Sequence, residues 1–229
     1  MIKNFEKRII PGITGFREKD WKEKLSQINK LKIKEAALFL ERFDQTQRKK
    51  IYRALLDSSL KRIPLVHARN DMEVEEFAFL ESKFKTGCFN FHEKGFGFLH
   101  KWKSFEKKIC LEMDYNDFIS KKVKVEKIGG FCVDLSHFKV AQERQSKEFD
   151  FIYFKKNKSK FLCNHLNGYS KNKNRDIHTV KSLRDFDYLK TLPEFIFGKF
   201  IGLEMENNIF QQLSYKKYLV KFLSGIFDK

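Results

Sequence analysis

Short apolar runs alternate with longer amphipathic stretches along almost the whole sequence, and this alternation most constrains the fold. Short apolar runs predict buried strands, whereas apolar residues that recur every three or four positions predict helices. Eight such units in 229 residues predict an α/β protein, a (β/α)8 TIM barrel that forms one compact domain over residues 1–229. An open doubly wound sheet is the alternative, but residues 11–15 lack the spacing of a phosphate-binding loop. The predicted strands are 9–16, 35–43, 63–67, 88–92, 109–113, 131–135, 161–166 and 200–205, and the predicted helices are 18–31, 45–60, 72–84, 139–149, 183–197 and 211–227.

Histidines and carboxylates occur at or just past the ends of the last six predicted strands. The active site of a (β/α)8 barrel lies at the C-terminal ends of its strands, so these side chains are expected to converge. Neutral imidazole and carboxylate are the ligands that zinc, manganese and iron prefer. The pattern therefore predicts a metal centre for zinc, with manganese or iron as alternatives. Its candidate ligands are His67, His92, Glu112, Asp134, His137, His165, Asp176, His178 and Glu204.

The order of these residues allows more than one ion to bind. Glu112, Asp134, His165 and Glu204 can converge on one ion near the barrel axis, a set of three carboxylates and one imidazole. His67 and His92 lie on neighbouring predicted strands and can hold a second ion, with Glu112 as the bridge. The third group would consist of His137, Asp176 and His178.

The net charge of the chain is +17, which favours an anionic partner such as nucleic acid. Five basic residues follow the candidate ligands or lie in the polar loop before Asp176, where they can contact phosphate groups. The alternative is an ordinary solvated surface in a lysine-rich protein. The five residues are Arg69, Lys94, Lys171, Lys173 and Arg175.

These motifs resemble the endonuclease IV family of the xylose isomerase-like barrel superfamily. The resemblance rests on the segments 131–137 (FCVDLSH), 164–167 (NHLN) and 176–178 (DIH), together with His67 and His92, and it extends from residue 63 to residue 204. It implies a trinuclear zinc-type apurinic/apyrimidinic endonuclease that hydrolyses the DNA backbone 5′ of abasic or damaged sites, and so takes part in DNA repair. By the same resemblance all nine candidate ligands would bind metal, and Glu112 and Glu204 would act directly in catalysis.

A second function is also consistent with these residues. Sugar or sugar-phosphate isomerases and epimerases of the same superfamily use one divalent ion, and here Glu112 and Glu204 would serve as ligands and as acid and base. Short loops after the strands favour this alternative, as does Asn70, which stands where the endonuclease IV family has an aromatic residue. The partner would then be a small sugar instead of DNA.

The four cysteines are each placed an even number of residues before a candidate ligand on a predicted strand. Side chains two residues apart on a strand share a face, so Cys88, Cys110, Cys132 and Cys163 are expected to lie beneath the ligands as apolar core residues. No apolar stretch approaches the ~18 residues of a membrane span. Residues 1–8 also lack the apolar core of a secretory signal. We therefore expect a cytoplasmic monomer without a membrane partner.

Overall fold

The protein is an α/β barrel of parallel strands, as the sequence predicts. A computed structural model describes residues 4–121 and 123–227. Within them, the main sheet has nine strands in the order β1-β11-β8-β7-β6-β5-β4-β3-β2, all paired in parallel. The strands are β1 (Ile9–Ile10), β2 (Gly12–Ile13), β3 (Ala37–Phe39), β4 (Leu65–His67), β5 (Cys88–His92), β6 (Ile109–Glu112), β7 (Gly130–Asp134), β8 (Phe161–Leu166) and β11 (Phe200–Leu203).

The two strands at the ends of this order are halves of one strand interrupted at Pro11. Proline has no backbone N–H to donate to a neighbouring strand, so the ladder breaks there. Ile9 and Ile10 pair with β11, whereas Gly12 and Ile13 pair with β3. Only Pro11 separates these halves, so the chain itself joins the two ends of the sheet and the predicted strand 9–16 closes the barrel. At this junction a Cβ on Gly12 would lie 2.1 Å from the Leu203 carbonyl oxygen, so only glycine fits.

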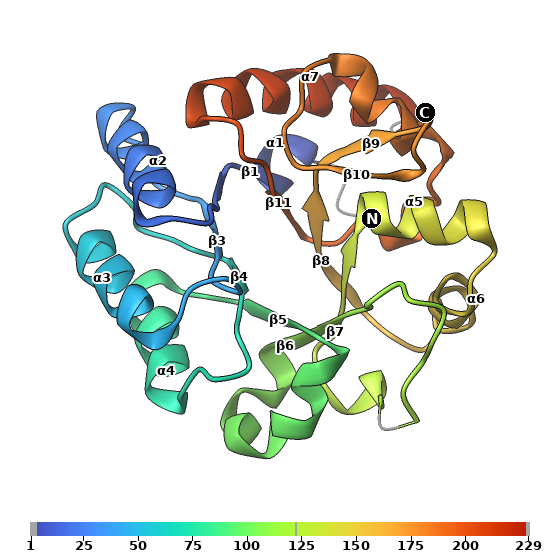
Figure 1. The fold of residues 1–229 in the computed structure, drawn as a ribbon, viewed down its shortest axis with the longest axis horizontal. Helices are drawn as coiled ribbons and strands as arrows, with labels where there is room; N and C mark the ends of the chain where they lie inside the picture. The colour runs from blue at the N-terminus through green and yellow to red at the C-terminus, as the bar shows by residue number, and fades with distance from the viewer. Residues whose placement is uncertain (1–3, 122, 228–229) are drawn as a thin grey trace.

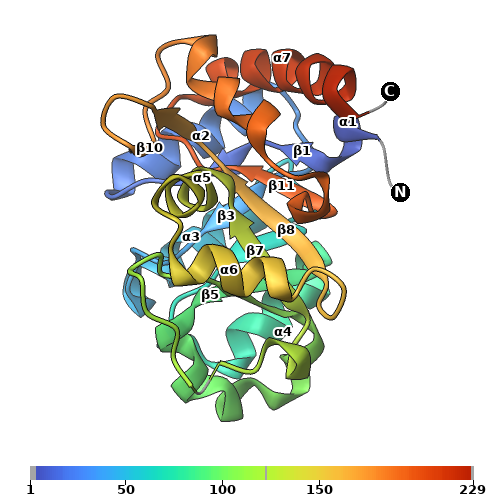
Figure 2. The same ribbon diagram turned by 90° about the vertical axis from the view of Figure 1, so that its right-hand side faces the viewer.

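The helices lie around the outside of the strands, and α2, α3 and α4 form one side of this outer layer (Figure 1). Seen from the side, α7 lies at the end of the molecule that also holds α1 (Figure 2). No helix in the described ranges is long and apolar enough to cross a membrane. The α-helices are α1 (Phe5–Arg8), α2 (Glu18–Lys30), α3 (Gln45–Leu56), α4 (Val74–Phe84), α5 (Leu135–Arg144), α6 (Lys147–Phe154) and α7 (Ile209–Phe227).

Two connections differ from the helices predicted for them. The predicted helix 139–149 is two helices, α5 and α6, because Gln145 takes a left-handed conformation (φ 51°) that ends α5. The predicted helix 183–197 consists of the 3-10 segments η3 (Leu183–Thr191) and η4 (Glu194–Ile196), which Pro193 separates. The connection from β5 to β6 is the 3-10 segment η1 (Glu93–Lys108), and η2 (Val125–Lys127) precedes β7.

The polar loop before Asp176 contains a small hairpin. Strand β9 (Gly168–Ser170) pairs antiparallel with β10 (Arg175–Ile177), and Asp176 lies opposite Tyr169. The side chain of Tyr169 also donates a hydrogen bond to Asn174 Oδ1 across the turn (2.8 Å). The hairpin thereby fixes the backbone on which Asp176 and His178 are carried.

Side chains fill the inside of the barrel, as expected for eight strands. All four cysteines are buried there, which confirms the prediction that they are interior residues beneath the candidate ligands. The remaining members of this interior cluster are Ile10, Ala37, Phe39 and Leu65. Most aromatic residues instead pack between strands and helices: Trp102, for example, is fully buried and stacks on Phe91 with ring centroids 4.4 Å apart.

A buried arginine joins α3 to α4. The Arg48 side chain is fully inaccessible, and it donates to both carboxylate oxygens of Glu76 at 2.8 and 2.9 Å and to Asp71 at 2.8 Å. Burial raises the pKa of Glu76, but the hydrogen bonds from Arg48 and Tyr52 outweigh it and keep that pKa below 4.5. A charge buried in this way is tolerated only when it is paired.

Replacing Glu76 by glutamine should lower the free energy of unfolding by about 2 kcal/mol at neutral pH, because Arg48 loses a charged partner while Asp71 remains. Since the folded protein lowers the pKa of Glu76, its stabilisation is present above pH 4.5 and is lost as the pH falls through the folded-state pKa. Urea unfolding across this pH range would measure the difference. Glu75→Gln, at the exposed neighbouring position, should change stability little at any pH.

Candidate metal centre

The strand register brings the predicted ligands together at one end of the barrel. His92 of β5 lies beside Glu112 of β6, and Asp134 of β7 lies beside His165 of β8. Each of these residues is the last residue of its strand or the one before it, so the four side chains belong to the C-terminal mouth of the barrel. Parallel pairing places such laterally matched residues on the same face of the sheet.

His165 is the centre of the first group. Its Nδ1 atom lies 3.2 Å from Glu112 Oε1 and 3.3 Å from Glu204 Oε2. Burial alone would raise the pKa of Glu204, yet the charges of His165 and His178 bring it to about 2. The pKa of Glu112 is likewise held well below 4.5 against its burial, by His165 and His92. Both carboxylates are therefore ionised, as metal ligation requires.

His67 connects this group to a second group of ligands, which contains His92. Its Nε2 lies 3.6 Å from Glu112 Oε2, its Nδ1 lies 4.0 Å from Glu204 Oε1, and its ring centroid is 5.1 Å from that of His92. Burial lowers the pKa of His67, so its imidazole is neutral. Neither ring nitrogen of this buried side chain has a hydrogen-bond partner in the described part of the chain. A buried imidazole of this kind, facing ionised carboxylates, has the arrangement of a metal ligand.

The third group surrounds Asp176, on the hairpin. His178 Nε2 lies 2.9 Å from Asp176 Oδ2, and His137 Nε2 lies 3.9 Å from the same oxygen. The hydrogen bond from His178 is the main reason that the pKa of Asp176 falls to about 2. His137 is in the first turn of α5, and its Nδ1 lies 3.7 Å from Asp134 Oδ2, which links this group to the barrel mouth.

Two buried asparagine side chains form hydrogen bonds with the candidate ligands. Asn90 donates to Glu112 Oε2 at 2.7 Å, and its Oδ1 lies 3.2 Å from His165 Nε2. Asn167 donates to Asp134 Oδ2 at 3.1 Å. The other oxygen of Asp134 accepts from the His137 backbone N–H and thereby caps α5. Partners of this kind orient metal ligands and set their protonation.

The structure adds two acidic residues that were not predicted from the sequence. The carboxylate oxygens of Glu41 lie 3.8 Å from His67 Nε2 and 3.8 Å from His92 Nε2, and the three residues form a group able to hold an ion. Asp114 Oδ1 lies 3.1 Å from His92 Nδ1. Glu41 follows β3 by two residues and Asp114 follows β6 by two, but Glu41 falls inside the predicted strand 35–43, which extends past the end of β3.

The five basic residues predicted to contact phosphate lie on segments that follow the candidate ligands. Four of them are exposed, whereas Arg69 is partly buried and its Nε lies 3.4 Å from Asp71 Oδ1. Another basic residue, Arg42, follows β3, and its guanidinium lies 3.8 Å from the ring centroid of Phe16, which follows β2. The four exposed residues are Lys94, Lys171, Lys173 and Arg175.

All nine predicted ligands therefore lie in one connected set at the mouth of the barrel, and Glu41 joins them. Among the described residues at the mouth, the sets whose ligand atoms are close enough for one ion are Glu41–His67–His92, His67–His165–Glu204 and Glu112–Asp134–His137. The set predicted for the ion near the barrel axis is therefore divided between two of these, and Asp176 and His178 belong to none of them. Imidazole and carboxylate donors fit zinc, manganese or iron. No family model, curated protein or solved structure matches the chain.

Proposed function

We propose that this protein is a metal-dependent phosphodiesterase that resembles endonuclease IV and hydrolyses the DNA backbone 5′ of abasic or damaged sites, using up to three zinc-type ions. The observation that carries the proposal is the sharing of ligands between neighbouring groups. Glu112 faces His165 with one oxygen and His67 with the other, and Asp134 faces His137 on its outer side. Shared carboxylates suit adjacent ions, which is the arrangement that phosphoryl-transfer sites use.

Bound zinc would supply Lewis-acid stabilisation of the phosphate oxygens and would lower the pKa of water toward neutrality. The residues of the chain would position the ions and the substrate and would supply charge around them. Ionised Glu112 and Glu204 fix the inner face of the centre, while Asp176 and His178 fix its outer face on the hairpin. The exposed Lys171, Lys173 and Arg175 on that hairpin and its turn would hold the phosphates of a polyanion beside it.

Replacing His178 by alanine should lower phosphodiester cleavage by at least about 10-fold, because Asp176 loses its nearest partner and the third group loses a ligand. An isomerase with one ion held by Glu112, Asp134, His165 and Glu204 would remain largely active. Cleavage of an abasic DNA duplex, measured together with a sugar isomerisation screen, separates the two functions. His100→Ala is the matched control, since this exposed histidine lies outside the centre.

Removing the three basic side chains of the hairpin should weaken DNA binding and reduce its salt dependence. Each lost phosphate contact lowers the slope of log K against log salt by about 0.9, so Lys171, Lys173 and Arg175 replaced together by alanine should reduce it by roughly 2 to 3. Fluorescence anisotropy at several salt concentrations gives the slope. The control replaces Lys61, Lys83 and Lys85, exposed residues at the opposite end of the barrel; an equal effect there would indicate binding by net charge alone.

A further inference from the structure

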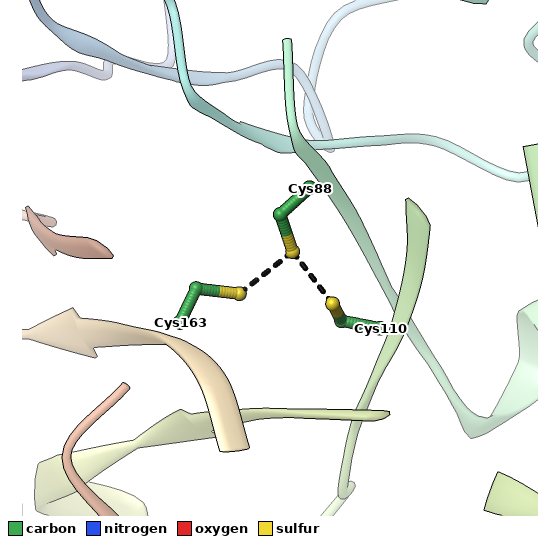
Figure 3. A group of neighbouring side chains, drawn as sticks. All are labelled: Cys88, Cys110 and Cys163. Carbon is green, nitrogen blue, oxygen red and sulfur yellow. Dashed lines mark hydrogen bonds between the residues drawn. The ribbon is translucent and has the colours of Figure 1, made fainter. Parts of the chain in front are cut away.

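A second group of metal-ligand side chains lies inside the barrel, below the mouth. Cys88 Sγ is 2.6 Å from Cys110 Sγ and 2.8 Å from Cys163 Sγ, and all three sulfurs lie within 4.8 Å of one another. The three side chains come from strands β5, β6 and β8 and point toward one another (Figure 3). All three are fully buried.

This arrangement differs from the ordinary packing of thiols in a core. Three sulfurs from separate strands converge on one point, whereas a disulfide would use only two of them. All four cysteines of the chain are free. The surroundings of the group are apolar, since Ala37, Phe39 and Leu65 belong to the same interior cluster. An apolar interior in which several sulfurs converge is the environment that selects a soft metal ion.

We propose that Cys88, Cys110 and Cys163 bind one thiophilic d10 metal ion, of which zinc is the representative, at a structural site inside the barrel. As each sulfur–metal bond forms, the thiol proton is released to solvent. Three thiolates and one divalent ion leave a net charge of −1, smaller in magnitude than that of a four-cysteine zinc site. With zinc–sulfur bonds of about 2.3 Å the sulfurs would stand roughly 3.8–4.0 Å apart. Rotation about the Cα–Cβ bonds therefore has to separate them by about 1 Å.

This site is distinct from the candidate metal centre at the mouth. Cys110 and Cys163 each precede a mouth ligand by two residues on the same strand, namely Glu112 and His165. Two residues along a strand span about 6.6 Å, so a zinc ion at bonding distance from these sulfurs is too far from the carboxylates above to share them. The inference is therefore independent of the proposed function, and it assigns a stabilising role to the ion, since an ion that binds only the folded state stabilises it.

Cobalt tests the proposal, because thiolate ligands give cobalt(II) an intense charge-transfer absorption in the near ultraviolet that imidazole and carboxylate ligands do not give. Wild-type protein produced in cobalt-supplemented medium and purified under reducing conditions should show this band. Its intensity should correspond to one thiolate-bound cobalt ion per chain. Cys88→Ala and Cys110→Ala should each abolish the band. Cys132→Ala removes the fourth buried thiol, which interacts with Cys163 but is not one of the three converging sulfurs, and should retain the band, as should His178→Ala at the mouth.

X-ray absorption at the zinc edge of the wild-type protein needs no variant and therefore covers the case in which a cysteine variant fails to fold. Sulfur neighbours at about 2.3 Å would support the site. Zinc with only nitrogen and oxygen neighbours, together with a wild-type cobalt protein that lacks the band, would overturn it and leave the thiols as core packing. A band that disappears in Cys132→Ala but persists in Cys88→Ala would also contradict the assignment.

Discussion

Replacing Glu112 by glutamine should reduce phosphodiester cleavage by more than about 100-fold and lower the metal content of the purified protein. Glutamine keeps the shape of the side chain and can still accept the hydrogen bond from Asn90, but it loses the charge that both His165 and His67 face. Loss of residues that only support a metal ligand typically costs 10–100-fold, and a carboxylate shared by two groups should cost more. Elemental analysis and a cleavage assay on abasic DNA measure the two effects.

Glu106→Gln provides the control for this substitution. Glu106 is a partly exposed residue of η1, three positions before β6, and it lies outside the groups of candidate ligands. The Glu106→Gln substitution makes the same chemical change near the same strand but does not alter the mouth of the barrel. A Glu112→Gln protein with normal metal content and normal cleavage would contradict the proposed metal centre.

Removal of metal with a chelator should lower the melting temperature by about 5–10 °C for each ion lost. An ion present at 100 times its dissociation constant stabilises the folded state by about 2.7 kcal/mol. In a chain of this length, 1 kcal/mol corresponds to about 2–4 °C. The physical reason is local: Glu112, Glu204 and Asp176 are held ionised by the histidines beside them, and a bound ion would offset these negative charges further.

Readdition of zinc should restore the melting temperature, and calorimetric scans with and without zinc give the measurement. A variant that carries both Glu112→Gln and Asp134→Asn should lose most of the response, because it removes both carboxylate charges of the Glu112–Asp134–His137 group. Magnesium serves as the control ion, since it prefers oxygen ligands and imidazole suits it poorly. A melting temperature that is insensitive to chelator and to zinc would count against a resident ion.

The barrel and most of its mouth could be predicted from the sequence because strand ends are marked by chemistry as well as by hydrophobicity. Each apolar run from β4 onward ends at or next to a histidine or carboxylate, and parallel pairing then brings such residues to one edge. His92 beside Glu112 and Asp134 beside His165 are direct results of that register.

Other features depend on tertiary contacts that a linear pattern does not contain. Glu41 lies two residues beyond β3, in an exposed turn where a carboxylate is unremarkable until His67 and His92 are placed next to it. Asn90 could not be recognised as a partner of Glu112 and His165, because its role depends on the interior position of its strand face. Segment η1 could not be predicted from the spacing of apolar residues either, because a 3-10 helix has a different repeat from the α-helix.

The split first strand has a consequence for the order in which the protein acquires its shape during synthesis. Ile9 and Ile10 leave the ribosome long before their partner β11, at Phe200–Leu203, is made. Arg8 likewise can donate its hydrogen bonds to the carbonyls of Phe197 and Gly198 only after those residues have been made. Pairing across such sequence separations is slow to form. The nascent chain therefore carries an open sheet with exposed edges until β11 has been translated, and a ribosome-bound chain truncated before residue 200 should remain sensitive to proteases.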